Sequence, residues 1–323
     1  MRIVVYGVGA IGGTVAAALA LSGQEVVGIA RGSQLEAILS GGLLLRTPGR
    51  TARAAFPCVS DPGEIDLRAD DAILLTMKTQ DTLPALERLR AAGVVDQPIF
   101  CVQNGVANER MALRRFPEVH GVTVMMPANL SVPGEVSAFS TPRHGIFDIG
   151  RYPAGTNVHD ETLARVLEAA NVAAFVTPEV MQRKYGKLLL NLNNILEAAL
   201  GVEADIKRFA AILRAEAEAV YAAAGIRWQD VGGSDPRRKE LMRYEPIAGV
   251  DRAGGSTTQS LARGAGSVET DYLNGEIVLL GRLHGVPVPA NAFVLGLSAR
   301  MARENLAPGF ISAADVEAGL TGS

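Results

Sequence analysis

A glycine-rich turn near the start of the chain constrains the fold more than any other feature. The segment reads Gly7-Val8-Gly9-Ala10-Ile11-Gly12. A β-branched run at Arg2–Tyr6 comes before it and predicts a strand, and an alanine-rich stretch at Ala10–Ser22 predicts a helix after it. In this strand–turn–helix context the GxGxxG spacing is typical of a dinucleotide-binding turn. Chance glycines in a flexible loop are the less favoured interpretation.

Each glycine of the turn has a physical reason. Gly7 permits the tight turn, Gly9 lets the backbone approach a pyrophosphate, and Gly12 lets helix and strand pack closely. The helix N-terminus supplies free N–H groups and partial positive charge to phosphates. We therefore expect the cofactor to be bound by Gly7, Val8, Gly9, Ala10, Ile11 and Gly12.

Strands and helices alternate over the first half of the chain. The alternation predicts βαβ units, a parallel sheet and an α/β fold with an N-terminal doubly wound domain of the Rossmann type. The further strands expected are Glu25–Ala30, Leu43–Arg46, Ala52–Val59, Asp71–Met77, Pro98–Val102, Val119–Met125, Glu135–Phe139, Ile146–Ile149 and Ala173–Val176. The helices expected among them are Gly32–Ser40, Leu83–Ala91, Ala107–Phe116 and Asp160–Ala170.

The predicted secondary structure changes at Thr177-Pro178, after which the sequence pattern is almost entirely helical. We expect a nucleotide-binding domain over residues 1–177 and an all-helical substrate and catalytic domain over residues 178–323. The polar, glycine-rich segment Arg227–Gly255 is interpreted as a loop with some turns. The helices expected are Val180–Leu200, Asp205–Ala224, Ser256–Arg263, Val268–His284 and Ala290–Glu304.

The end of the second strand selects between the two nicotinamide cofactors. An acidic residue there binds the ribose 2′-hydroxyl of NAD, whereas a cation suits the 2′-phosphate of NADP. Arg31 stands at that end, and Glu25 lies at the strand's start. The sequence therefore predicts NADP, although a merely solvated arginine is the alternative.

Composition excludes several classes of protein. The net charge of −3 lacks the basic excess typical of nucleic-acid-binding proteins, so we expect no nucleic-acid partner. No run reaches the ~18 apolar residues of a membrane span, and no signal-peptide pattern is present, so we expect no membrane partner and a cytoplasmic location. Cys58 and Cys101 fit no metal-ligand spacing, so we expect no metal site and two buried core thiols.

One predicted helix carries an unusual polar stripe. Lys187, Asn191 and Asn194 fall on one side of it, with Lys184 beside them, among leucines and isoleucine. Burying these groups is costly unless something satisfies them, and a polar substrate would do so. A solvated face opposite core leucines is the equal alternative.

At this point the chain resembles the ketopantoate reductase (2-dehydropantoate 2-reductase) family over nearly its whole length. The resemblance rests on several motifs taken together. They are the Gly7–Gly12 turn, Arg31, Met77-Lys78-Thr79-Gln80, Gln103-Asn104-Gly105, Lys187-Leu188 followed by Asn191, Glu269-Thr270-Asp271-Tyr272-Leu273-Asn274-Gly275, and His284-Gly285-Val286-Pro287-Val288-Pro289.

The resemblance implies catalytic roles. Lys187 would be the general acid that protonates the C2 ketone oxygen as hydride arrives, and Glu269 would help order the substrate and Lys187. Lys78 and Asn104 would lie near the nicotinamide and the substrate. Other interpretations stay open: a solvated loop lysine for Lys78, a simple turn for Asn104, and a favourable helix-start carboxylate for Glu269.

The resemblance also implies substrate contacts. Asn191 would contact a substrate hydroxyl, and Ser256 or Thr257 would hold the substrate carboxylate. Two departures from the family pattern bear on this: Ile195 stands where a second asparagine is frequent, with Asn194 as a substitute, and the serine segment is imperfect. The 2-oxo acid reduced could therefore differ from ketopantoate.

Three functions follow from these residues. The first is NADPH-dependent reduction of 2-dehydropantoate. The second is the same chemistry on another small-molecule 2-oxo acid, and the third is a non-catalytic NADP-binding sensor, which would need no proton donor. The oligomeric state is open, with a homodimer as one alternative.

Overall fold

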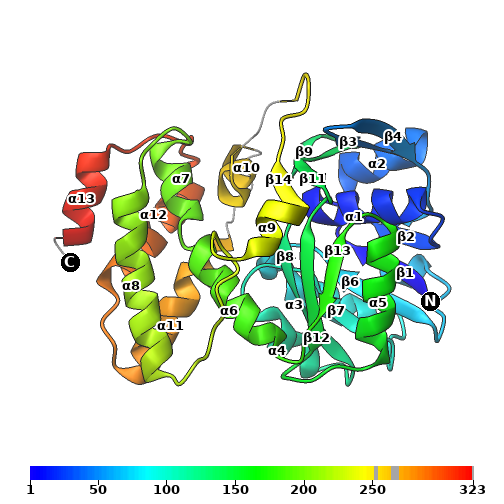
Figure 1. Ribbon diagram of the computed structural model, residues 1–323, viewed down its shortest axis with the longest axis horizontal. Helices are drawn as coiled ribbons and strands as arrows, with labels where there is room; N and C mark the ends of the chain where they lie inside the picture. The colour runs from blue at the N-terminus through cyan, green and yellow to red at the C-terminus, as the bar shows by residue number, and fades with distance from the viewer. Residues whose placement is uncertain (251–253, 263–268, 322–323) are drawn as a thin grey trace. The chain divides into compact units, whose positions relative to one another are not determined.

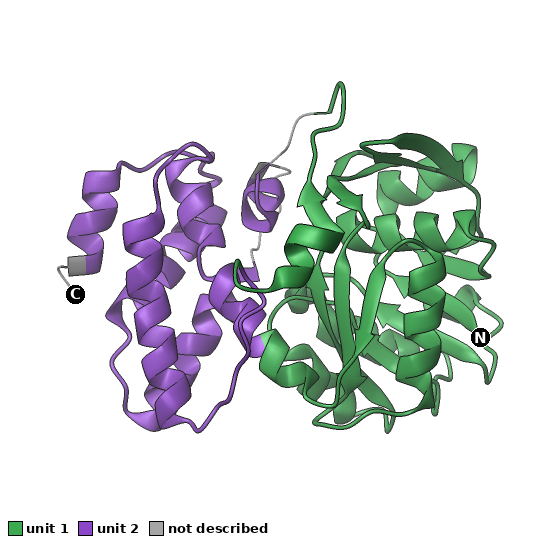
Figure 2. Cartoon of the chain, viewed as in Figure 1, with its two compact units in different colours: residues 1–184, 233–252 green, residues 185–232, 253–323 purple. Residues whose placement is uncertain are grey.

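The structure, a computed structural model, describes residues 1–250, 254–262 and 269–321. The chain forms two compact units (Figure 2). Unit 1 contains residues 1–184 and 233–252, and unit 2 contains residues 185–232 and 253–323. The division differs from the expected boundary at Thr177-Pro178, because the first part of helix α6 (Val180–Asn191) packs with the sheet and a later segment returns to it.

Within the described residues, unit 1 is built on an eight-stranded sheet (Figure 1). Its neighbouring strands pair in parallel, except for the antiparallel pair β12 and β8. The spatial order is β13 (Ala173–Val176), β12 (Ile146–Arg151), β8 (Val119–Met125), β7 (Ile99–Cys101), β6 (Asp71–Leu75), β1 (Arg2–Tyr6), β2 (Val26–Ile29) and β5 (Cys58–Val59). This is the doubly wound arrangement that the sequence predicts.

Two apolar layers cover the central strands. Ile3 and Val5 of β1 face one cluster with α1 (Ala10–Leu21) and α5 (Val158–Ala169). Val4 and Tyr6 face the opposite cluster with α3 (Thr82–Ala91) and α4 (Asn108–Leu113). Strands buried on both faces read as continuous apolar runs, which explains the sequence Arg2–Tyr6. Both cysteines are free and buried, as expected.

A smaller sheet lies beside α1, and one of its strands differs from the sequence prediction. Its order is β4 (Arg50–Ala54), β3 (Leu43–Thr47), β10 (Glu135–Ala138) and β9 (Ala128–Val132). The expected strand Ala52–Val59 is wrong as one element, because β4 pairs with β3 while β5 pairs with β2 of the large sheet. Pro57, which has no N–H for a ladder, lies between the two strands.

The described residues of unit 2 are helical, with two departures from the expected helices. The helix expected over Val180–Leu200 breaks at Leu192 and Asn193, so α7 (Asn194–Leu200) is separate from α6. The helix expected over Val268–His284 is instead a 3-10 turn, η3 (Glu269–Tyr272), followed by α11 (Asn274–His284). Arg263 and Val268, at the ends of two expected helices, lie outside the described residues. The other helices are α8 (Lys207–Ala223), α10 (Ser256–Ala262), α12 (Pro289–Glu304) and the unexpected α13 (Ala313–Thr321).

The segment expected to be a loop, Arg227–Gly255, holds two elements that return to unit 1. Helix α9 (Pro236–Leu241) runs into strand β14 (Met242–Tyr244), which pairs with β11 (Ser140–Pro142). Short elements of this kind depend on partners distant in sequence, so local pattern did not reveal them. The strand β14 also corrects the expectation that residues 178–323 are all helical.

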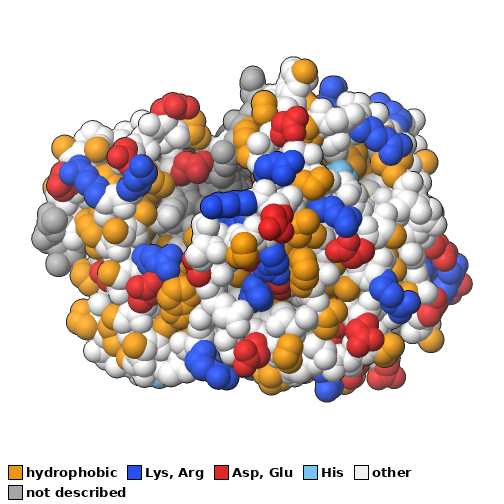
Figure 3. Space-filling model, viewed as in Figure 1, with side chains coloured by type: hydrophobic (Ala, Val, Ile, Leu, Met, Phe, Trp, Pro, Cys, Tyr) orange, Lys and Arg blue, Asp and Glu red, His pale blue; other side chains and the backbone are white. Residues whose placement is uncertain are grey.

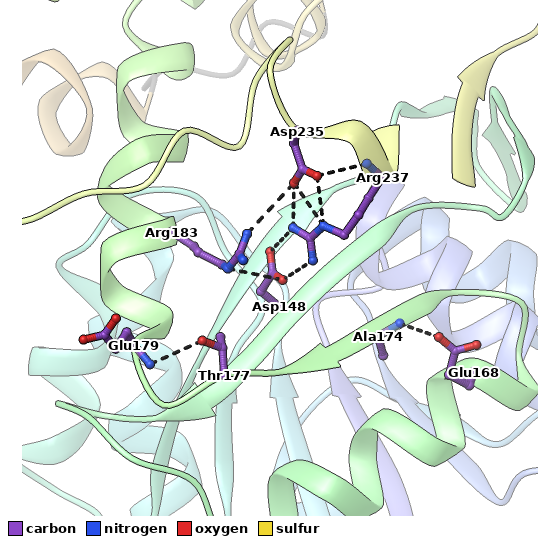
Figure 4. A network of polar contacts seen from close by, with 8 residues as sticks. All are labelled: Asp148, Glu168, Ala174, Thr177, Glu179, Arg183, Asp235 and Arg237. Carbon is purple, nitrogen blue, oxygen red and sulfur yellow. Dashed lines mark hydrogen bonds and ion pairs between the residues drawn. The ribbon is translucent and has the colours of Figure 1, made fainter. Parts of the chain in front are cut away.

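Ion pairs fasten this returning segment to the sheet (Figure 4). Arg237 of α9 donates from Nη1 to Asp148 Oδ1 of β12 at 2.7 Å and from Nη2 to Asp235 Oδ2 at 2.6 Å. Arg183 of α6 lies 3.6 Å from Asp148 Oδ1 and 3.9 Å from Asp235 Oδ2. The Arg237 guanidinium also lies over the ring of Phe175. The carboxylate of Asp148, which is only 1% exposed, is therefore compensated from two elements.

Charged side chains of both signs are interspersed on the described face that Figure 3 shows. Among the described residues, no helix is long and apolar enough to cross a bilayer.

Replacing the central arginine of this network should destabilise the protein. Arg237→Met leaves the buried Asp148 with Arg183 as its remaining cation in the network, at 3.6 Å, and breaking a buried pair costs roughly 3 kcal/mol or more. We expect that loss in the free energy of unfolding, measured by urea titration. Arg300→Met, which breaks an exposed pair with Glu304 in α12, is the control and should cost under about 1 kcal/mol.

The same network makes stability depend on acid. Burial alone would raise the pKa of Asp235, but its hydrogen bonds with Arg237 and the attraction of that cation lower it overall. The contribution is therefore present above the unfolded pKa of ~4 and is lost as the pH falls through the folded pKa. The Arg237→Met variant should lose less stability over this acidic range; equal acid sensitivity would contradict the network's role.

Candidate active site

Four predicted cofactor positions lie at the carboxyl ends of adjacent strands. The turn after β1 carries Gly7, Arg31 follows β2, Lys78 follows β6 and Asn104 follows β7. The strand order reverses between β1 and β6, with α1 on one face and α3 on the other. Ligands of open α/β sheets bind at such a switch point.

The glycine turn is shaped by close contacts with the loop that follows β6. Gly7 has φ +106°, and a Cβ there would lie 2.8 Å from the backbone N of Met77. A Cβ on Gly12 would lie 2.3 Å from both Gly7 O and Thr76 Oγ1. The Thr76 hydroxyl donates to Gly7 O at 2.8 Å, so the loop after β6 is joined to the turn.

The turn also leaves space and donors for phosphate. A Cβ on Gly9 would meet one protein atom, Gly7 O at 3.9 Å, within the 4 Å contact range. The first helical turn has no acidic residue and no side-chain cap, so the N–H groups of Ala10, Ile11 and Gly12 point out of the helix start. The Val8 side chain is buried, and the Val8 carbonyl accepts a hydrogen bond from Gln34. Val8 therefore contributes only its backbone to the surface of the turn. These features fit a dinucleotide pyrophosphate.

The residue expected to choose the cofactor is exposed. Arg31 is the N-cap residue of α2 (Gly32–Gly41), and its side chain forms no ion pair with any residue in the described ranges. Glu25 lies at the other end of β2 and pairs with Arg68 at 2.8 Å. The carboxyl end of β2 therefore presents a cation without an accompanying acid.

The loops after β6 and β7 are tied together through their backbones. Asn108 Nδ2 donates to Asn104 O at 3.0 Å and to Thr79 Oγ1 at 3.2 Å. Gln103 Nε2 donates to Met77 O at 2.8 Å. The side-chain amide of Asn104 makes no hydrogen bond to the part of the chain that the structure describes. The network thus orders this loop without using that amide.

In unit 2 the break after α6 separates the predicted stripe. Lys187 is partly buried on α6, and Asn191 is the last residue of that helix. Asn194 begins α7, so the expectation that it continues the lysine's stripe on one helix is wrong. The buried Oδ1 of Asn191 has no hydrogen-bond partner among the described residues. An orphaned amide oxygen next to a lysine-bearing turn fits a ligand donor such as a hydroxyl.

The motif around Glu269 packs against this helix break. Asn274 donates to the Leu192 carbonyl at 3.2 Å and to Asn291 Oδ1 at 3.0 Å. Glu269 itself is buried at the start of η3, as is Thr270. Part of the motif therefore has a structural task, which is to satisfy the carbonyl exposed where α6 ends.

A carboxylate of the chain itself occupies the start of α10. Ser256 is the first residue of that helix, and Thr257 is buried. Glu197 Oε1 of α7 accepts from the Gly255 N–H and lies 3.5 Å from Thr258 Oγ1. Glu197 could not be predicted from the sequence, because a single acid in an apolar helix carries no local signal for a partner 58 residues away.

Lys184 lies one turn before Lys187 on α6, beside the predicted stripe. Its side chain is buried in unit 1 against Glu109 of α4, a partner that the sequence did not indicate. Among the described residues, no group of His, Cys, Asp and Glu is arranged to hold a metal ion.

Comparison with known proteins identifies the family. Residues 3–154 match the family model described as ketopantoate reductase PanE/ApbA, and residues 179–302 match that of its C-terminal part. The 2-dehydropantoate 2-reductase of Caulobacter vibrioides is 30% identical, covering 91% of this chain and 97% of the relative. That of Archaeoglobus fulgidus is 28% identical, covering 92% and 96%. This chain belongs to the ketopantoate reductase family, which is a family of reductases.

Solved structures show the same fold. A PanE/ApbA family ketopantoate reductase from Ralstonia eutropha superimposes with a TM-score of 0.78 at 29% identity, covering 94% of this chain and 99% of that one. D-mandelate dehydrogenase in complex with NADH and anilino(oxo)acetate gives 0.77 at 22% identity, with coverages of 94% and 99%. The second likeness shows the fold alone.

Adding one methyl group to the turn should disrupt it. Gly12→Ala places Cβ against Gly7 O and Thr76 Oγ1, and overpacking of this kind costs roughly 3 kcal/mol. We expect a lower unfolding midpoint in urea. Gly49→Ala, in an exposed turn with no atom within 4 Å of the new Cβ, is the control and should change stability by less than about 0.5 kcal/mol. Equal stabilities would contradict the close packing.

Proposed function

We propose that this protein reduces 2-dehydropantoate to pantoate with NADPH as the reductant. The observation that carries the proposal is the match of both family models, one over the glycine turn and the other over the helix with Lys187. In the net reaction, 2-dehydropantoate, NADPH and a proton give pantoate and NADP⁺. When bound, the cofactor supplies a hydride equivalent to C2 of the 2-oxo acid.

The chain's residues divide into cofactor-holding and substrate-holding groups. The backbone of Gly7–Gly12 would hold the pyrophosphate at the start of α1, and Arg31 would bind the 2′-phosphate. Lys78 and the side-chain amide of Asn104, at neighbouring strand ends, would border the nicotinamide.

Lys187 would hold a proton at Nζ and donate it to the C2 oxygen as negative charge develops there. The Asn191 amide, whose Oδ1 is buried without a partner among the described residues, would accept a hydrogen bond from a substrate hydroxyl. Glu269 would order these groups, with Asn194, Ser256 and Thr257 as the further substrate contacts proposed.

A second 2-oxo acid is favoured by one observation. Glu197 places a carboxylate at the start of α10, where the substrate carboxylate is proposed to bind near Ser256 and Thr257. Two carboxylates at one site repel each other. A substrate that places its carboxylate elsewhere would avoid this repulsion, and a panel of 2-oxo acids that includes 2-dehydropantoate tests for it.

Removing the proposed general acid should abolish turnover. We expect Lys187→Ala to lower kcat by about 10²–10⁴-fold with 2-dehydropantoate, because the alkoxide then lacks its proton donor. NADPH oxidation followed by absorbance measures this. Lys207→Ala, an exposed lysine of α8, is the control. Normal turnover in Lys187→Ala would refute the assigned acid, and NADPH binding by wild type without turnover on any 2-oxo acid would favour the sensor.

Removing Arg31 should weaken the preference for NADPH. In Arg31→Ser the 2′-phosphate loses its cation, so we expect KM for NADPH to rise at least about tenfold while KM for NADH changes little. Steady-state kinetics with both cofactors measures the ratio, and Arg50→Ser, an exposed residue of β4, is the control. An unchanged ratio would mean that Arg31 is only a solvated charge.

A further inference from the structure

A buried ion pair lies directly behind the loop that carries Asn104. Lys184 of α6 contacts Glu109 of α4, and their side chains are 2% and 0% exposed. The Lys184 Nζ also donates to the Gln103 carbonyl at 3.0 Å and reaches the Cys101 carbonyl at 3.5 Å. The lysine therefore binds the last residue of β7 and the residue before Asn104.

The surrounding elements leave room for this pair. Gly121 of β8 lies opposite Cys101 in the sheet. A Cβ on Gly121 would lie 3.5 Å from Glu109 Oε1 and 3.5 Å from Lys184 Cδ, and 3.2 Å from Val180 Cγ1. The pair also affects its neighbour: burial raises the pKa of the Cys101 thiol, and the charge of Glu109 raises it further.

Stability alone does not explain the pair. Apolar residues of similar size in place of a buried ion pair are often neutral or stabilising, because desolvation offsets the attraction. Moreover, Glu109 Oε2 is buried without a hydrogen-bond partner among the described residues, so the compensation is incomplete. What the pair does provide is a specific geometry, in which the charged Lys184 amine points at two backbone carbonyls at the end of β7.

The residue before Glu109, which is the first residue of α4, completes the arrangement. Asn108, beside Glu109, holds the Asn104 carbonyl, while Lys184 holds the Gln103 carbonyl. Each of these contacts goes to the backbone, and the Asn104 side-chain amide has no partner within the described residues. The peptide groups on both sides of the Asn104 side chain are thus held by hydrogen bonds, and Asn104 is the residue proposed to border the nicotinamide.

We propose that Lys184 and Glu109 are positioning residues: their ion pair holds the Gln103–Gly105 loop so that the Asn104 amide is set for hydride transfer. This inference rests on the proposed function for its kinetic consequence. Lys187 follows three residues later on the same helix, so the two lysines have separate tasks, one structural at the strand end and one proposed as the proton donor.

The test replaces the whole pair, which avoids leaving one charge buried. In the double variant Lys184→Met/Glu109→Leu we expect an unfolding midpoint close to wild type and a Kd for NADPH within about threefold, since the phosphate contacts are elsewhere. We expect kcat to fall at least about tenfold, because small misplacements near the reacting atoms are costly. Amide exchange of peptides covering residues 99–108 should become faster.

The matched control is Arg2→Met/Asp71→Leu, which removes another buried ion pair, at the amino ends of β1 and β6. It should leave kcat and the exchange of residues 99–108 unchanged. The proposal is overturned if the Lys184/Glu109 variant keeps wild-type kcat and exchange, or if its kcat loss only follows a loss of folded protein. A wild type that reduces no 2-oxo acid would refute the proposed function instead, and the exchange experiment would still decide whether the pair holds the loop.

Discussion

The contact between the start of α1 and the ends of β1 and β6 is the constraint on which unit 1 depends. At Gly12 the space left by the missing side chain is filled by Gly7 O and the Thr76 hydroxyl. This close approach fixes the helix start over the point where the strand order reverses. It also brings the loop with Lys78 beside the glycine turn, so residues distant in sequence that are proposed to bind the cofactor share one edge of the sheet.

Around that edge, the atoms that hold the loops in place differ from the atoms proposed to bind a ligand. Loop backbones are held by Thr76, Asn108 and Lys184, while the amide of Asn104 and the guanidinium of Arg31 form no contact within the described chain that would compete with a ligand. The buried Oδ1 of Asn191 in unit 2 is similar. Within each unit, supporting groups that are satisfied beside unsatisfied groups proposed to bind a ligand would favour binding with little rearrangement.

The sequence predicted well what depends on local pattern. The turn, the strands with continuous apolar runs and the helices of the first half follow from short-range periodicity and glycine placement, and they lie where expected. Predictions failed where distant partners decide. The helix break at Leu192–Asn193 is satisfied by Asn274, 82 residues from Leu192, and α9 with β14 is anchored by Asp148, 89 residues from Arg237. The local sequence pattern does not indicate partners that are this distant along the chain.

The sequence by itself therefore determined the fold class, the nucleotide edge and the cation at the end of β2, because glycine spacing and strand–helix alternation are local consequences of backbone sterics. Only the tertiary structure decided which polar residues serve each other. Lys184 and Lys187 stand on one helix and cannot be told apart by periodicity, yet burial pairs the first with Glu109. The reason is that desolvation assigns a charge its partner across the fold, and burial is a property of the packed chain and not of its local sequence.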